Sequence, residues 1–195
     1  MNKNESFFKY MPLRDLRRFI DILINEHLYA ARFTDLNDPM EGMFMVDFEH
    51  RDLIDLMKRE KYKNRICSLS STGNHSLMWS HYADGHRGCC IEVSLRSNKL
   101  QANPIEYTDT LPRVDHNNQG RNVLLCKSKL WKYEQEVRVF SRTKWVCVNI
   151  QRVTLGCRVP KSDVAFYTDL IARINPCIHV DQMCESKLNE GFNNI

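Results

Sequence analysis

Hydrophobic and polar positions recur along this chain with two periods. A period of two residues predicts a strand, and a period of three to four residues predicts a helix, because side chains repeat on one face at those intervals. The pattern predicts helices over 12–24, 53–57, 77–82 and 160–174. It predicts strands over 7–10, 28–31, 65–70, 89–95, 136–140, 145–150, 153–156 and 177–180.

The order of these elements predicts an α+β fold. Residues 104–125 show no sustained period, so we expect a long loop there with one strand near 105–107. The helices gather toward the N-terminus and the strands toward the C-terminal half, which favours a mostly antiparallel sheet. We predict a single domain over 1–185, followed by a polar tail over 186–195.

Composition places the chain among ordinary globular proteins. Hydrophobic residues make up 43% and charged residues 27% of its 195 positions, which argues against intrinsic disorder. No apolar run approaches the ~20 residues that a membrane helix needs, and no signal peptide is visible at the start. We therefore expect a cytoplasmic protein that does not bind to a membrane.

The net charge of +4 is too small to indicate a dedicated nucleic-acid binder. Basic residues cluster over 58–63 and again over 121–132. Such clusters are usually solvated surface, although they would also suit an anionic substrate or an acidic partner.

The eight cysteines are predicted to be reduced, because the chain is long enough to build its own core and no secretion signal is visible. A zinc site would have to use His75, His81, His86 and Cys89, whose spacings match no standard pattern. We expect no metal.

Three segments carry more polar and aromatic residues than packing requires. Residues 36–41 contain Asn37 and Asp38 ahead of Pro39, which is also what a simple turn would show. Residues 78–88 combine two histidines with Trp79 and Tyr82, which suits either a core helix or a pocket for a planar ring.

The third segment, residues 129–138, ends in a row of ionisable side chains. If the chain is extended there, Glu134, Glu136 and Arg138 project to one face. An unpaired buried carboxylate is very costly, so this face should meet a pocket or water. The simplest alternative is an edge strand whose glutamates pair with Arg138 in solvent.

In order along the chain, these motifs resemble a widespread bacterial family of unknown function. The resemblance covers about residues 7 to 160 and includes a Cys-x-x-Ser strand at Cys67. Its motifs are Lys9-Tyr10, Asn37-Asp38-Pro39-Met40-Glu41, Met78 to Gly88, and Lys127 through Trp131, Glu134 and Glu136 to Arg138.

The succession of strands also resembles that of an ADP-ribosyltransferase. The resemblance implies that Glu136 is catalytic and that Glu134 orients the acceptor. It implies NAD-binding roles for further residues, which are Lys9, Tyr10, Ser68, Ser70, Trp79, Tyr82, His86 and Arg138. The early basic position is usually Arg or His in that family and here is Lys9, and no Ser-Thr-Ser triplet is present.

The chemistry would suit these residues. Cleavage of the nicotinamide–ribose bond develops positive charge on the ribose, which a fixed carboxylate stabilises. The leading hypothesis is therefore an ADP-ribosyltransferase-like or NAD glycohydrolase-like protein, with NAD as substrate and a macromolecular acceptor, possible roles being phage defence or stress response.

Two other classes of function remain open. The first is a non-enzymatic module that recognises a ligand or a protein partner in a defence system. The second is a metal-dependent nuclease that uses Asp38, Glu41, Glu134 and Glu136. The sequence leaves open whether the protein is an enzyme.

Overall fold

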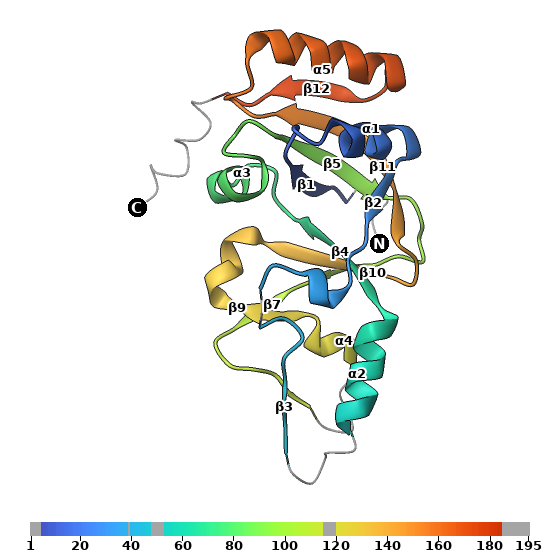
Figure 1. Cartoon of the computed structure of the whole chain (residues 1–195), viewed down its shortest axis with the longest axis vertical. Coiled ribbons are helices and arrows are strands. Elements are labelled where there is room, and N and C mark those ends of the chain that lie inside the picture. Colours follow the sequence, from blue (N-terminus) through green and yellow to red (C-terminus); the bar gives the residue numbers. More distant parts are fainter. Residues whose placement is uncertain (1–4, 39, 48–52, 115–119, 185–195) are drawn as a thin grey trace. The chain divides into compact units, whose positions relative to one another are not determined.

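The computed structural model describes residues 5–38, 40–47, 53–114 and 120–184 (Figure 1). The fold is α+β, and the strands of its main sheet pair mostly antiparallel, as predicted. The chain divides into two compact units. Unit 1 comprises residues 1–28, 70–97 and 147–195, and unit 2 comprises residues 29–69 and 98–146. One domain over 1–185 stays a prediction, and the predicted tail over 186–195 lies outside the described residues.

The sheet of unit 1 has the strand order β12-β11-β5-β1. Strand β5 lies between two neighbours, so its side chains are almost all buried, which suits its small and β-branched residues. Ser70, the last residue of β4, pairs with Phe8 beside it. The bounds of these strands are β1 Phe7–Met11, β5 Cys89–Leu95, β11 Trp145–Leu155 and β12 His179–Gln182; the short β2, His27–Tyr29, also pairs with β11.

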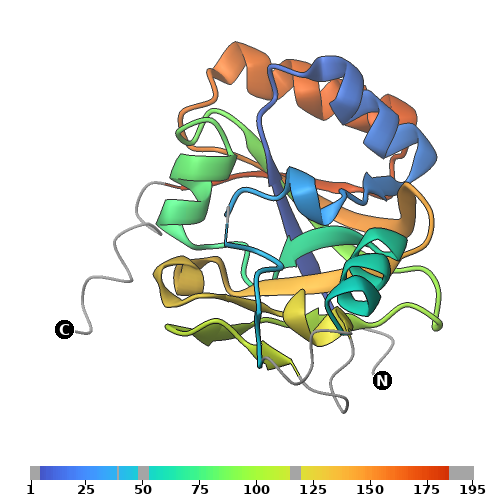
Figure 2. The same ribbon diagram turned by 60° about the horizontal axis from the view of Figure 1, so that its bottom comes forward.

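Helices α1 (Leu16–Asn25) and α5 (Lys161–Ile174) run side by side in unit 1 (Figure 2). The rings of Phe19 and Tyr167 meet edge to face, with centroids 5.7 Å apart. The carboxylate of Asp15 caps α1 by accepting a hydrogen bond from a backbone N–H of its first turn, so the helix begins after this residue and not at the predicted proline. The short α3, Ser76–Tyr82, agrees with its prediction.

In unit 2, strand β10 (Glu136–Ser141) lies between β4 (Arg65–Ser70) and β6 (Ala102–Pro104). Two small parallel pairs accompany it, β3 (Met45–Val46) with β8 (Arg113–Val114) and β7 (Glu106–Thr108) with β9 (Cys126–Ser128). The remaining elements are the α-helices α2, Leu53–Lys63, and α4, Gly120–Val123, and the 3₁₀ helices η1, Phe33–Asp35, and η3, Lys129–Glu134.

Besides the start of α1, the structure differs from the sequence prediction in three further segments. The two strands predicted over 145–150 and 153–156 are one strand, β11, whose register shifts between Ile150 and Arg152. The predicted loop over 104–125 contains the strand expected near 105–107, which is β7, but it also holds the strand β8 and the helical turn α4. The segment 129–134 is not extended but forms a 3₁₀ helix.

All eight cysteines are free thiols, and three of them, Cys67, Cys89 and Cys90, are buried. Burial raises the pKa of the Cys89 and Cys90 thiols, so both stay protonated and act as small apolar side chains. No helix in the described ranges combines the length and the hydropathy that a membrane span requires.

Candidate functional site

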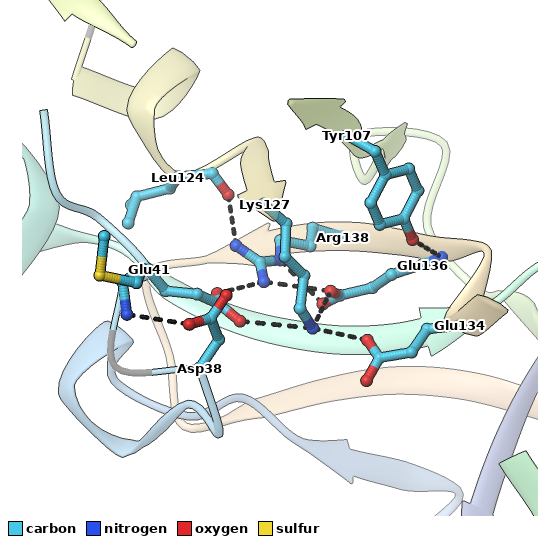
Figure 3. Close-up of polar contacts among 9 residues, drawn as sticks. Asp38, Glu41, Tyr107, Leu124, Lys127, Glu134, Glu136 and Arg138 are labelled. Atoms are coloured by element: carbon cyan, nitrogen blue, oxygen red, sulfur yellow. Dashed lines mark hydrogen bonds and ion pairs between the residues drawn. The ribbon is translucent and has the colours of Figure 1, made fainter. Parts of the chain in front are cut away.

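Five charged side chains of unit 2 gather in one buried group, which we call the charged cluster: Glu41, Lys127, Glu134, Glu136 and Arg138 (Figure 3). Their side chains are only 0–6% exposed. They come from the loop after η1, from β9, from the end of η3 and from β10. Segments that are far apart in the sequence therefore meet through ionic contacts.

Arg138 forms the centre of this cluster and is fully buried. Its guanidinium donates to both carboxylate oxygens of Glu136, from Nε at 2.8 Å and from Nη2 at 3.1 Å. Nη2 also donates to Glu41, and Nη1 donates to the backbone carbonyl of Leu124 at 2.6 Å. Charge-assisted, forked contacts of this kind are the strong class of hydrogen bond, so Arg138 fixes both carboxylates.

Lys127 supplies the second cation. Its Nζ lies 2.5 Å from Glu134, 3.0 Å from Glu136 and 3.4 Å from Glu41. The same ammonium lies 5.0 Å from the centre of the Trp131 ring, within cation–π range. Three carboxylates thus face two cations, and each carboxylate is paired at least once inside the cluster.

Local backbone structure explains why these side chains point inward. The Ser128 hydroxyl caps η3 by accepting from a backbone N–H, and Gln135 ends it in the left-handed conformation with φ 44°. This turn reverses the chain before β10 begins. Glu136 and Arg138, two residues apart in β10, then share a face, as the sequence predicted.

The pKa values of Glu136 and Glu41 shift in opposite directions, because burial and the neighbouring cations balance differently at the two carboxyl groups. Burial alone would raise the pKa of Glu136, but the charge and hydrogen bonds of Arg138, the charge of Lys127 and a hydrogen bond from Ser68 lower it to about 2. At Glu41, burial is the larger effect and raises the pKa, although Arg138 and Lys127 oppose it. Glu136 is therefore ionised at any physiological pH.

Asp38 is buried beside the charged cluster (Figure 3). Its Oδ1 accepts a hydrogen bond of 2.9 Å from the backbone N–H of Met40, which is the turn contact expected of this residue type. Within the described residues, its Oδ2 is buried and has no hydrogen-bond partner.

Three aromatic residues of unit 1, Tyr10, Trp79 and His86, pack against one another. The Tyr10 and Trp79 rings meet edge to face at 5.4 Å, and the His86 ring stacks on Trp79 at 6.2 Å. The Trp79 indole is fully buried and donates to the backbone carbonyl of Gly73, and the Tyr10 hydroxyl donates to that of Thr72. Trp79 thus belongs to the core of unit 1 and reaches no surface.

The structure brings together some of the predicted site residues. Glu134, Glu136 and Arg138 share the charged cluster, and Ser68 hydrogen-bonds to Glu136 there. The remaining predicted residues all belong to unit 1: Lys9, Tyr10, Ser70, Trp79, Tyr82 and His86. Of these, Lys9 and Tyr82 are half-buried, and Ser70 is buried with its hydroxyl accepting from the Thr72 backbone N–H.

Sequence reasoning assigned no site role to Lys127 and left the role of Glu41 open. Both lie in motifs that it singled out, Asn-Asp-Pro-x-Glu and Lys-x-x-x-Trp. The feature of the sequence that could have identified them is that acidic and basic residues lie in separate polar segments, each without an oppositely charged partner nearby in the sequence. Their pairing could not be read from spacing, because Glu41 and Arg138 are 97 positions apart.

In the described part of the chain, no three His, Cys, Asp or Glu side chains are grouped so that they could hold a metal ion. In the charged cluster, the carboxylates form ion pairs with Lys127 and Arg138. The chain matches no family model, no curated protein and no solved structure.

Proposed function

We propose that this protein is a ligand-recognition module. In this function the charged cluster holds the segments of unit 2 in one arrangement and takes no part in a chemical reaction. The observation that carries the proposal is the closure of the cluster: all five side chains are paired with each other and at most 6% exposed. A catalytic carboxylate must touch its substrate, whereas Glu136 touches Arg138, Lys127 and Ser68. Buried ionic networks of this type hold distant segments in one arrangement.

This function is tested by incubating the protein with NAD, with and without Mg²⁺ and candidate acceptors, and measuring free nicotinamide. We expect no release above that of a heat-inactivated sample, and no difference between the wild type and Glu136→Gln. Release of nicotinamide that falls about 100-fold in Glu136→Gln, with folding confirmed by a thermal melt, would refute the recognition proposal.

One observation favours the second candidate, an NAD-dependent transferase or glycohydrolase. Glu136 is ionised and fixed by three side chains, which is the preorganised state that stabilises an oxocarbenium-like transition state. In that function, Glu134 would orient the acceptor, and a nucleotide would have to take over the hydrogen bonds that Lys127 now gives to both glutamates. The nicotinamide assay separates the two candidates.

A further inference from the structure

Helix α2 presents a basic face to solvent. Its buried residues, Leu53, Met57 and Lys61, recur at a spacing of four, so they lie on one side of the helix and pack into unit 2. The opposite side borders an open hollow of about 600 Å³. Among the described residues, those that line this hollow are Asp55, Lys58, Arg59, Tyr62 and Lys63.

Two further cations join this face from outside α2. Helix α4 packs beside α2 and carries Arg121 (Figure 1). Arg142, in the bend between β10 and β11, donates from Nη1 to the backbone carbonyl of Lys63 at 3.3 Å. The pKa of the Glu60 carboxyl is lowered mainly by its hydrogen bond from Lys63 and further by the charges of both arginines, so both guanidiniums lie near α2. We call this surface the basic patch; its members are Lys58, Arg59, Tyr62, Lys63, Arg121 and Arg142.

The positive charge of the basic patch is only partly neutralised. Its two lysines pair with carboxylates of the same helix, at 3.8 Å and 2.7 Å. Arg59, Arg121 and Arg142 are exposed and form no ion pair with any of the described residues. Three positive charges therefore remain on one surface of unit 2, although the net charge of the whole chain is only +4. A ligand that carries several negative charges complements this surface.

Tyr62 adds an aromatic ring to these charges. The residue is 65% exposed, and its ring meets that of Phe33 edge to face, with centroids 5.1 Å apart. The contact with Phe33 restricts the Tyr62 side chain, while most of the residue stays in solvent. A nucleic-acid base can stack on such a ring at little cost in conformational entropy. Exposed aromatic rings among basic side chains are typical of surfaces that bind single strands.

The extent of the basic patch favours a strand over a single nucleotide. Lys58 and Lys63 are five residues apart, which is about 7.5 Å along a helix axis. Arg121 and Arg142 belong to two other elements. A row of phosphates can reach cations on all three elements, which one phosphate cannot. The ring of Tyr62 also needs an unpaired base, because the bases of a duplex are already stacked on one another.

The charged cluster supports the segments that carry the basic patch. Arg138 donates to the backbone carbonyl of Leu124, whose own N–H donates to the carbonyl of Arg121 at 3.0 Å. On the inner face of α2, the ammonium of Lys61 donates at 2.6 Å to the carbonyl of Gly42, which directly follows a member of the cluster. Both helices of the patch are thus tied to the buried ionic network.

We propose that the basic patch binds single-stranded nucleic acid, with its three arginines contacting phosphates and Tyr62 stacking on a base. The proposal rests on the recognition function and gives its ligand class. An acidic peptide would use the arginines but would gain little from the tyrosine, so Tyr62 separates the two kinds of ligand.

Fluorescence anisotropy with labelled oligothymidylate and oligouridylate, each of twelve nucleotides, tests the proposal. In about 50 mM salt we expect a Kd below about 50 µM for at least one of them. Three phosphate contacts predict that the logarithm of the affinity falls with the logarithm of the salt concentration with a slope of about −2. Arg59→Gln should weaken binding at least threefold and make this slope shallower by about 0.7, because one contact is lost.

Substitutions of Tyr62 separate stacking from attraction between charges. Tyr62→Ala should weaken binding at least fivefold and leave the salt slope unchanged, whereas Tyr62→Phe keeps the ring and should keep the wild-type affinity. Matched controls on α5 of unit 1 are Lys161→Gln, at an exposed cation, and Phe166→Ala, at an aromatic residue that is 53% exposed. Both should leave the Kd unchanged. Thermal melts confirm that all five variants are folded.

Three results would overturn the proposal. The first is that neither oligonucleotide binds at about 50 µM protein. The second is a Kd that Arg59→Gln or Tyr62→Ala leaves unchanged. The third is that a labelled peptide of twelve glutamates binds more tightly than both oligonucleotides and is unaffected by Tyr62→Ala, which would identify the basic patch as a site for an acidic protein.

The outcome is distinguishable from failure of the proposed function. If no oligonucleotide binds and no nicotinamide is released, the ligand class is wrong while the recognition function stands. If Glu136-dependent release of nicotinamide occurs, the recognition function fails whatever the anisotropy shows.

Discussion

Arg138 illustrates how a single buried residue can contact three segments of unit 2. A fully buried guanidinium is tolerated only when each of its donors has a partner. Here Glu136, Glu41 and the Leu124 carbonyl supply those partners. Replacing one member of such a network is expected to be more harmful than removing an exposed pair, because the remaining charges stay buried.

We predict that Arg138→Met lowers the free energy of unfolding by about 3–5 kcal/mol, since Glu41 and Glu136 would keep only Lys127 as a counter-charge. Urea unfolding followed by circular dichroism measures the change. Arg173→Gln is the control, because its pair with Asp169 is largely exposed, and it should leave the unfolding midpoint in place. Equal effects of the two variants would contradict the role of the cluster.

At the scale of elements, unit 1 relies on close approach between backbone segments. Gly156 follows β11 and its backbone N–H donates to the carbonyl of Gly88. A Cβ at Gly156 would lie 2.1 Å from the carbonyl oxygen of His86, which no side chain could relieve by rotating. The turn before β5 and the end of β11 can therefore meet only without a side chain at this position.

We predict that Gly156→Ala destabilises the protein by about 3 kcal/mol, because the backbone itself would have to move. Gly85→Ala is the comparison: space is available there, with the nearest atom 3.6 Å from the added Cβ, but its φ of +60° strains an alanine. That strain corresponds to about 1 kcal/mol. Thermal melts of both variants test the order, and a larger loss for Gly85→Ala would show that the backbone contact is unimportant.

At the scale of the whole molecule, the charged cluster links stability to pH. The pKa of Glu136 is about 2 in the folded protein against an ordinary 4.5. A carboxyl group with a lowered folded pKa stabilises the fold above its unfolded pKa and loses that contribution as the pH falls. Glu41 acts in the opposite direction, because its raised pKa makes protonation easier in the folded state.

We predict that the contribution of Glu136, of order 3 kcal/mol, disappears as the pH falls from about 4.5 to about 2. Urea unfolding at pH 7, 4.5 and 3 measures this dependence. Glu136→Gln should be less stable than the wild type at pH 7, and its stability should depend less on pH below pH 4.5. Glu5→Gln, an exposed control, should keep the pH dependence of the wild type. An unchanged slope in Glu136→Gln would assign acid sensitivity to other groups.

The local spacing of hydrophobic residues was sufficient to predict those helices and strands that bury one or both of their faces. Strands β4 and β5 have the predicted bounds, and α2 and α3 lie where their apolar spacing placed them. The beginning of α1 was misplaced, because the side chain of Asp15 and not Pro12 satisfies the first backbone N–H groups. Short-range periodicity reports burial, and burial of a face is what makes these segments regular.

The short strands of unit 2 could not be predicted in this way. Among these short strands, only β7 was expected, near 105–107. Strands β3, β8 and β9 have two or three residues each, too few to show a period, and they exist because a distant segment pairs with them. The same holds for β11, where the register shift near Ile150 looked like a break between two strands.

For the charged cluster, sequence established which residues needed an explanation, and the tertiary structure supplied it. A run of Glu134, Glu136 and Arg138 required a pocket, water or partners, since desolvated charges are costly. The choice among these depended on Glu41 and Lys127, which reach the same point through chain folding. Hydrophobic periodicity acts between neighbours in sequence, whereas the pairing of buried charges acts between neighbours in space.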